Sequence, residues 1–197
     1  PFDPILPQIA FRARLYGRGV PMAKLVFAMN VSLDGYVDHD RFSPGPDLFR
    51  HWVDQVKASS AALYGRKIYE LMRYWEQDQP DWGPDEQAFA QAWCAQPKWV
   101  ASRTLRAVGP NATLVPDNIA VVAADVKSRF SGDVDVCGTI LAQSLAEAGL
   151  VDEYRLYFHP VVLGHGKPFF AGPVPPMRLA GSERIDDQVV RLTYHPA

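Results

Sequence analysis

The sequence contains little cysteine, and its two cysteines lie far apart. Cys94 and Cys137 form no C-x-x-C pair and fall in different predicted elements, a helix and a strand. A disulfide framework needs several paired cysteines, and a thiolate metal centre needs closely spaced ones. The sequence therefore favours neither, and we expect a protein of a reducing compartment, with the cytoplasm as the default.

Long apolar segments and an excess of one charge are also missing. The longest apolar runs, residues 25–29 and 119–124, are far shorter than the roughly 20 residues that span a bilayer. The chain has 20 Lys and Arg against 22 Asp and Glu, a formal net charge of −2. A surface that binds nucleic acid or an anionic membrane needs a basic excess, so we predict neither partner.

Residues 1–21 lack the features of a secretion signal. They contain arginines and prolines but no continuous apolar segment, and the first Met is Met22. We expect these residues to be a leader or an added extension, with native translation starting at Met22. The predicted domain covers residues 22–197.

The motifs of several enzyme classes are absent. The sequence has no G-x-G-x-x-G after its first strand-like segment, no G-x-x-x-x-G-K-[ST] and no G-x-S-x-G. The histidines show no spacing typical of zinc ligands. They are His39, His51, His159, His165 and His195. These absences argue against a standard Rossmann domain, a P-loop NTPase, an α/β-hydrolase and a metalloenzyme.

The composition is that of one globular domain. Of 197 residues, 48% are hydrophobic and 21% are charged, which is enough apolar material for one sizeable core. Strand-like and helix-like segments alternate along most of the chain, and the last part reads as strands. Strands are expected at 24–31, 61–64, 98–101, 113–115, 134–137 and 153–162, with two more within 177–194 joined through Asp186–Asp187.

Helical spacing of apolar residues follows most of these strands. Helices are expected from Asp47 as N-cap, from the glycine turn at residue 65 to Trp75, and at 85–95, 118–130 and 139–149. Alternation of this kind predicts an α/β fold: a mostly parallel, twisted central sheet with flanking helices and an antiparallel C-terminal edge.

Three predicted strands end at turns that suit a phosphate group. The turns are Gly65–Arg66, Ser102–Arg103 and Gly138–Thr139. Ligands of open α/β sheets bind at the carboxyl ends of the strands, where helix N-termini offer free backbone amides. Guanidinium groups grip phosphate, and a serine beside an arginine suits a 2′-phosphate, which favours NADPH over NADH. From spacing alone, two solvated surface arginines are an equal alternative.

Five segments, in order along the chain, share motifs with one known family. They are residues 26–37 with S-L-D-G, 63–70 with G-R-K, 100–105 with A-S-R-T-L, 138–141, and 156–170 with H-P-V-V-L-G-H-G-K-P-F-F. In this order they resemble the dihydrofolate-reductase-like family, on the branch of the C-terminal reductase domain of riboflavin-biosynthesis proteins. The resemblance covers nearly all of the chain from Lys24 to Tyr194.

The resemblance implies an NADPH-dependent oxidoreductase of the 5-amino-6-(5-phosphoribosylamino)uracil reductase type. Hydride would pass to a small pyrimidine-, pteridine- or ribosylamino-type substrate. By position, Gly65 and Arg66 would meet the pyrophosphate, and Ser102 and Arg103 the 2′-phosphate. The protein's part would be positioning and electrostatics, because the hydride chemistry belongs to the cofactor.

Further cofactor contacts follow from the same resemblance. Ser32 and Gly35 would border the nicotinamide. The backbone of the cofactor would lie along the turn made by Gly138, Thr139, Ile140 and Leu141. Cys137 is also predicted to contact the cofactor, but it stands where the family usually has the first glycine of a pair.

Asp34 is the predicted catalytic residue. As a substrate-side acid it would anchor an amine or hydroxyl of the substrate or orient its loop, whereas a local turn role is equally compatible with the sequence. Asp47 and His165 are candidate substrate-binding residues, with an N-cap and a solvated loop position as their alternatives.

Two functional hypotheses follow. The first is an NADPH-dependent reductase, and the alternative is a catalytically inactive nucleotide-binding or interaction protein that keeps the fold. A pocket blocked by tryptophan or Cys137 side chains would favour the alternative. The C-terminal strands offer an edge through which we expect the chain to form a homodimer.

Overall fold

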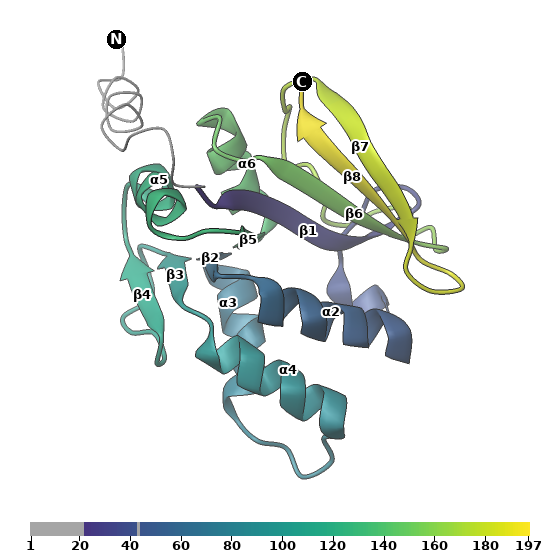
Figure 1. The fold of residues 1–197 in the computed structure, drawn as a ribbon, viewed down its shortest axis with the longest axis horizontal. Coiled ribbons are helices and arrows are strands. Elements are labelled where there is room, and N and C mark those ends of the chain that lie inside the picture. The colour runs from purple at the N-terminus through teal and green to yellow at the C-terminus, as the bar shows by residue number, and fades with distance from the viewer. Residues whose placement is uncertain (1–21, 43) are drawn as a thin grey trace.

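The computed structural model of the protein describes residues 22–42 and 44–197, so the predicted leader lies outside the described residues. Its centre is an eight-stranded sheet in the order β4-β3-β2-β5-β1-β6-β8-β7 (Figure 1). The strands are β1 Lys24–Ser32, β2 Ala61–Gly65, β3 Lys98–Ala101, β4 Ala112–Val115, β5 Asp133–Cys137, β6 Glu153–His159, β7 Met177–Arg184 and β8 Val190–Pro196.

The first six strands are parallel to one another, and the last two are antiparallel. β8 pairs antiparallel with β6, and β7 pairs antiparallel with β8 and forms the edge of the sheet. The mixed sheet with an antiparallel C-terminal edge is confirmed, including the turn through Asp186 and Asp187 between the two last strands.

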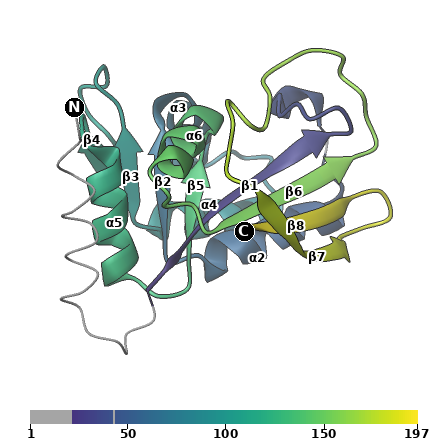
Figure 2. The ribbon, with the colours of Figure 1, turned by 90° about the horizontal axis from the view of Figure 1, so that it is seen from above.

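Helices cover both faces of the sheet. They are η1 His39–Arg41, α2 Pro46–Ala58, α3 Arg66–Met72, η2 Arg73–Glu76, α4 Pro84–Ala95, α5 Ile119–Arg129 and α6 Thr139–Glu147. In Figures 1 and 2, α2, α3 and α4 lie on one face of the sheet, and α5 and α6 lie on the other.

The alternation of strand side chains builds a separate core on each face. Leu63 of β2 packs in the core under α5 and α6, whereas its neighbour Tyr64 packs in the aromatic core against α3 and α4. In that second core, Trp93 donates a hydrogen bond to the Tyr64 hydroxyl at 2.9 Å. A strand that is buried on both faces needs apolar residues at successive positions, which Ala61 to Tyr64 supply.

The predicted start of α2 and the predicted end of β6 are wrong. Asp47 is not the N-cap of α2: Gly45 holds that position and Pro46 begins the helix, where a missing amide costs no hydrogen bond. Asp47 lies in the first turn, where a carboxylate complements the helix dipole. β6 ends at His159 rather than at residue 162, because Pro160 has no N–H to continue the ladder.

The end of α6 also comes earlier than expected, at Glu147. Gly149, with φ +67°, donates to the Ala146 carbonyl, and Leu150 donates to the Leu145 carbonyl, both at 2.9 Å. These two hydrogen bonds around a glycine in the left-handed conformation form a Schellman motif, which ends the helix and turns the chain toward β6.

Candidate functional site

The parallel strands end at one edge of the sheet, and the chain leaves two neighbouring strands in opposite directions there. β1 leads to α2 on one face, and the adjacent β5 leads to α6 on the other face. Open α/β sheets generally bind their ligands at such a point, and we call this point of the sheet the crevice. Ser32, at the end of β1, and Gly138, after β5, flank this point.

The two glycine turns predicted to meet the cofactor touch each other. A Cβ atom on Gly138 would lie 3.8 Å from Cα of Gly65 and 3.5 Å from Cγ1 of Ile68. Gly138 has φ +120°, a conformation that L side chains rarely adopt. The turn after β5 therefore needs a glycine here, and it brings the ends of β2 and β5 into contact.

Free amides are present at the start of α6. The first backbone bond within the helix runs from the Ala142 amide to the Gly138 carbonyl at 2.9 Å, and no side chain caps the N-terminus. The amides of Thr139, Ile140 and Leu141 precede that bond and therefore have no partner within the helix. Thr139 and Leu141 are buried, and Ile140 is 72% exposed. These amides suit an anionic group at the crevice.

Two predicted arginines share one open pocket of about 420 Å³ at the ends of β2, β3 and β4. Arg66, Ser102 and Arg103 line it, together with the loop that enters α5. The structure thus brings together two arginines that are 37 positions apart in sequence, as the prediction of a shared strand-end site requires. Arg66 forms an exposed ion pair with Glu70 at 3.1 Å, so one carboxylate already competes for it.

The hydroxyl of Ser102 serves its own turn. It accepts hydrogen bonds from the amides of Thr104, at 3.2 Å, and Leu105, at 3.0 Å. These bonds fix the backbone that presents Arg103 at the pocket. The role of Ser102 that the structure shows is therefore to hold the loop that carries Arg103.

Cys137 does not obstruct the crevice. Its side chain packs with the aromatic core on the α2 side of the sheet, next to Tyr64, and burial raises the pKa of its thiol well above the ordinary value. Only its backbone faces the glycine turn, with the carbonyl oxygen 3.6 Å from where a Cβ on Gly65 would stand. Neither Cys137 nor a tryptophan lines the pocket of Arg66 and Arg103.

The S-L-D-G loop is tied to the loop after β6 by a ladder of backbone bonds. Leu33 donates to the Val161 carbonyl at 2.8 Å, Val37 donates to Lys167 at 2.8 Å, and Phe169 donates to Gly35 at 2.9 Å. Ser32 is fully buried, and its hydroxyl accepts the Tyr36 amide at 2.9 Å. The two loops that resemble the family most closely therefore form one unit beside the crevice.

Asp34 joins the same two loops through its side chain. It accepts hydrogen bonds from the Ser32 hydroxyl at 2.6 Å, the Leu163 amide at 3.1 Å and the Gly164 amide at 2.7 Å. The Ser32 bond, followed by the two amides, lowers the pKa of this exposed carboxyl. Asp34 is thus ionised at neutral pH and holds the loop, which is one of the two roles expected for it.

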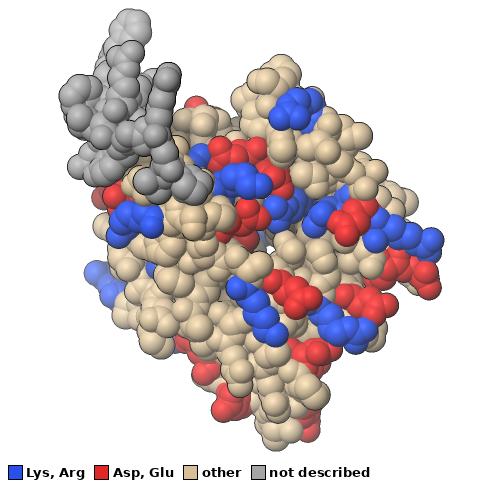
Figure 3. Space-filling view, in the orientation of Figure 1, with Lys and Arg blue, Asp and Glu red and all other residues tan. Residues whose placement is uncertain are grey.

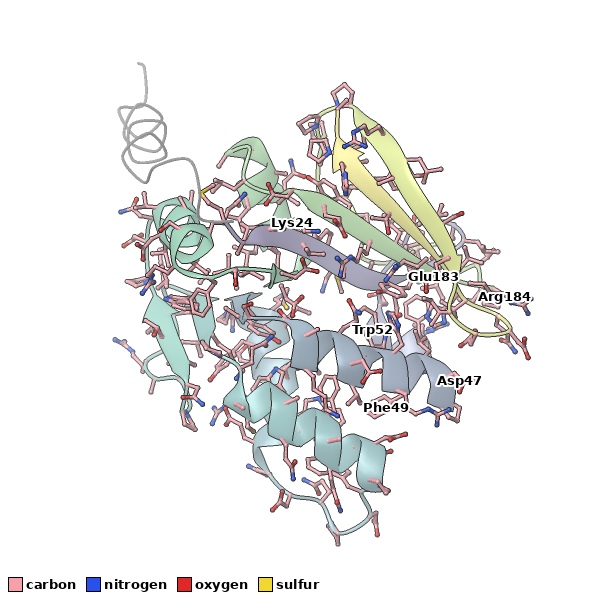
Figure 4. The ribbon with its side chains drawn as sticks, in the orientation of Figure 1. Lys24, Asp47, Phe49, Trp52, Glu183 and Arg184 are labelled. Carbon is pink, nitrogen blue, oxygen red and sulfur yellow. The ribbon has the colours of Figure 1, made fainter. Side chains whose placement is uncertain are left out.

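Asp47 lies at a second pocket, of about 290 Å³, at the same edge of the sheet. The start of α2 and the turn between β7 and β8 form its walls, and the lining residues include His159, Asp186 and Asp187. In Figure 4, Asp47 and Arg184 lie at the same end of the molecule, where α2 begins and β7 ends. His165, the other candidate for substrate binding, is exposed and lines neither pocket.

Sequence reasoning missed His159, Asp186 and Asp187 as site residues. His159 is paired with Ser32 across β1 and β6, so its place beside the S-L-D-G loop follows from the parallel register. The hairpin turn reaches this edge because β8 runs antiparallel to β6. His159 is the first residue of the H-P-V-V-L-G-H-G-K-P-F-F motif, but no local motif marks Asp186 and Asp187 as site residues. The strand order is what places all three at this edge.

Buried polar atoms without partners gather between β1, β6 and α2. Among the described residues, Oδ1 of Asn30, Nε1 of Trp52 and Nε2 of His159 are buried with no hydrogen-bond partner. Trp52 points from α2 toward the sheet and lies 4.5 Å from the Tyr157 ring, centroid to centroid (Figure 4). Unsatisfied buried groups are uncommon in folded proteins, and they mark places where a bound molecule can supply the missing bonds.

The described residues contain no group of three or more His, Cys, Asp or Glu arranged to hold a metal ion. Over the same ranges, no helix is long and apolar enough to cross a bilayer. On the face seen in Figure 3, basic and acidic side chains lie next to one another rather than in separate patches.

Comparisons with known proteins agree with the fold. The model of the RibD C-terminal domain matches residues 134–191. The uncharacterized protein YyaP of Bacillus subtilis is 29% identical over 184 residues, which cover 87% of this chain and 94% of YyaP.

Two solved structures share most of the architecture. A putative riboflavin biosynthesis protein from Shewanella sp. PV-4 superimposes with a TM-score of 0.66 at 22% identity, covering 89% of this chain and 99% of that one. Dihydrofolate reductase from Enterococcus faecalis, complexed with NADP(H), gives a TM-score of 0.59 at 13% identity, covering 89% and 97%. The resemblance predicted from the sequence is thereby confirmed: the chain has the dihydrofolate-reductase-like fold and matches the RibD C-terminal domain.

Proposed function

We propose that this protein is an NADPH-dependent reductase that transfers hydride to a small ring-containing substrate. The observation that carries the proposal is the pocket at the ends of β2, β3 and β4, where Arg66 and Arg103 converge beside the touching glycine turns. The comparisons support a reductase-type fold, and one structural neighbour is a dihydrofolate reductase complexed with NADP(H).

The residues present fit the cofactor. Gly138 leaves space where a side chain would meet the turn at Gly65, and the free amides of α6 lie beside that space. Arg66 would hold the pyrophosphate, and Arg103, presented by the Ser102 turn, would hold the 2′-phosphate. NADPH bound there would supply the hydride.

The chain's own groups position the reaction. The loop of Ser32 to Gly35 borders the crevice, and Asp34 fixes it to the loop after β6. Because Asp34 is ionised and fully engaged by donors, we assign it the role of a positioning residue rather than a proton donor. A low pKa is unsuited to proton donation near neutral pH.

The test is a fluorescence titration with NADPH and NADH. Arg103→Ala should weaken NADPH binding by about 10- to 150-fold, since charge-assisted hydrogen bonds contribute roughly 1.5–3 kcal/mol, and it should leave NADH binding nearly unchanged. Lys57→Ala, on the solvent side of α2, is the control. Equal affinity of the wild type for the two cofactors would contradict the 2′-phosphate assignment.

The same titration separates the reductase from an inactive relative that keeps the fold. If NADPH binds tightly but is not oxidised in the presence of pyrimidine, pteridine or ribosylamino substrates, the result would favour a nucleotide-binding protein. Absence of NADPH binding by the wild-type chain would reject both.

A further inference from the structure

The pocket of Arg66 and Arg103 also contains an acidic residue, to which the proposed function gives no role. Asp117 is the one carboxylate among the lining residues, beside the two arginines. A negative charge in a pocket that holds a phosphate weakens the attraction of the arginines for that phosphate. If the pocket served only to bind phosphate, a neutral side chain at this position would serve it better.

Asp117 lies next to the turn of Ser102 and Arg103 because β3 and β4 are paired and end together. The Ser102 amide donates to the carbonyl of Val115, the last residue of β4, at 3.0 Å. Pro116 has no N–H with which to continue the ladder, so the chain leaves the sheet there and Asp117 follows at once. Asp117 is exposed, so a molecule bound in the pocket can reach it.

The loop that carries Asp117 is held by backbone bonds rather than by its carboxylate. Asn118 has φ +57° and ψ +39°, a left-handed conformation that asparagine tolerates better than most residues. Its carbonyl accepts the amides of Val121 at 3.0 Å and Val122 at 3.2 Å, and these bonds begin α5. The arginine on the other side of the pocket, Arg66, pairs with Glu70 and not with Asp117. The Asp117 carboxylate therefore remains available to a ligand.

A purely structural role for Asp117 makes a different prediction. Asp117 directly precedes Asn118, the N-cap of α5, and a carboxylate near a helix N-terminus stabilises the helix dipole. That interaction contributes to the free energy of unfolding, and it acts equally whichever cofactor is bound. A role in the pocket instead changes the affinity for one cofactor relative to the other, so the two roles can be separated by measurement.

We infer that Asp117 limits the preference of this pocket for NADPH over NADH, and the inference rests on the proposed function. In α/β folds that bind dinucleotides, a carboxylate accepts a hydrogen bond from the ribose 2′-hydroxyl of NADH, whereas an arginine accommodates the 2′-phosphate of NADPH. This pocket contains both kinds of residue, so Asp117 and Arg103 act in opposite directions on the same ribose position. Two arginines outweigh one carboxylate, so NADPH stays the preferred cofactor, by a smaller factor than the arginines alone would give.

The test is the ratio of the dissociation constants for NADH and NADPH, measured by fluorescence titration of the wild type and two variants. Asp117→Asn removes the charge but keeps an acceptor oxygen, so it should tighten NADPH binding by about fivefold and change NADH binding by less than about twofold. Asp117→Ala also removes the acceptor, so it should tighten NADPH binding similarly and weaken NADH binding by about threefold. The gain in NADPH affinity should shrink at high salt, which screens exposed charges.

Asp125→Asn is the matched control, because it removes the same charge from α5 outside the pocket, where Asp125 pairs with Arg129 at 2.7 Å. It should leave the ratio unchanged. Thermal unfolding of each variant measures the structural role separately. A ratio that both Asp117 variants leave unchanged, with or without a loss of stability, would overturn the inference while the proposed function stands. A wild type that binds neither cofactor would overturn both.

Discussion

The carboxylate of Asp34 accepts the amide of Gly164, 130 residues later in the sequence, at 2.7 Å. Through this bond and its neighbours, the loop after β1 and the loop after β6 behave as one structural unit. The crevice at the carboxyl end of β1 is therefore bordered by two segments that are far apart in sequence, the loop after β1 and the loop after β6.

Replacement of Asp34 tests this anchoring role. We expect Asp34→Ala to speed hydrogen exchange of the amides at 163 and 164, and to lower turnover by about tenfold through loss of loop position. Asp34→Asn retains an oxygen for only one of the two amides, because Leu163 and Gly164 donate to different carboxylate oxygens, and it should keep more of the activity than Asp34→Ala. Equal loss of turnover in both variants, with exchange unchanged, would instead indicate direct contact with substrate.

The anchor also predicts a pH dependence. The Ser32 hydroxyl and the two loop amides lower the pKa of Asp34 below its ordinary 3.8. The contribution of the carboxylate to stability is therefore complete at neutral pH and is lost as pH falls through the lowered pKa. Thermal unfolding curves of the wild type and Asp34→Ala should converge at the acid end of the pH range.

Gly164 and Gly166, in the loop after β6, both have a positive φ, but only Gly166 has a close neighbour where a Cβ would stand. Gly166 has φ +147°, and a Cβ there would lie 2.0 Å from Oδ2 of Asp38, the atom that accepts the Lys167 amide. Gly164 has φ +76° and nothing within 4 Å of its added Cβ. Gly164→Ala should cost about 1–2 kcal/mol of unfolding free energy from backbone conformation alone.

Gly166→Ala should cost more than this, because the Asp38 contact must also break. Denaturant unfolding of both variants measures the difference. Similar losses in the two variants would show that the loop adapts around residue 166.

Asp135 predicts a stability change near neutral pH. Burial raises the pKa of this carboxyl to about 6, and its strongest hydrogen-bond donors, Ser59 and Gln96, do not offset that cost. Because the folded pKa exceeds the unfolded 3.8, this group favours folding at low pH, and its contribution falls as pH rises from about 4 to 6. Asp135→Asn should raise the unfolding free energy at pH 7.5 by up to about 3 kcal/mol.

The same substitution should make little difference at pH 4, where the wild-type carboxyl is protonated in the folded state. Chemical unfolding at both pH values measures this. A gain that is equal at pH 4 and pH 7.5 would exclude ionisation as its cause.

The ion pair between Arg66 and Glu70 predicts a gain in cofactor affinity. Both side chains are 41% exposed, so the pair is screened and contributes little to stability. Glu70→Gln should free Arg66 for a phosphate and tighten NADPH binding by about two- to fivefold, with a smaller change at high salt. Unchanged affinity would place Arg66 away from the bound phosphates.

We propose that the edge strand β7 pairs with a second copy of the chain. Among the described residues β7 pairs with a strand on one side only, and Leu179 on it is 58% exposed. Leu179→Lys should convert a dimer to a monomer in light scattering coupled to gel filtration, since charged edge residues block strand pairing. A monomeric wild type would reject the proposal.

Much of the fold was predictable because the local patterns are strong. Leu63 and Tyr64 in an unbroken apolar run indicated a strand buried on both faces, and the glycine at 65 marked its end. The start of α2 was misplaced by two residues because Asp47 has the chemistry of an N-cap, and only the backbone angles of Gly45 show which residue caps.

The candidate site was predictable in part, for a different reason. Arg66 and Arg103 come together because parallel strands end at one edge, and this rule needs no knowledge of strand order. Asp47 and Asp186 line the same pocket because β8 returns antiparallel, which places residues 139 positions apart at that pocket. Local sequence carries no signal for such an arrangement.

The position of β1 in the sheet affects how the chain can fold. β1 is made first among the strands, yet its two neighbours, β5 and β6, begin at Asp133 and Glu153. During synthesis at about 5–20 residues per second, the apolar β1 must wait several seconds before either partner exists. Contacts of such long sequence separation also slow folding. A ribosome-bound chain ending before residue 133 should therefore expose this strand to chaperones, and completion of β6 should be the event that releases it.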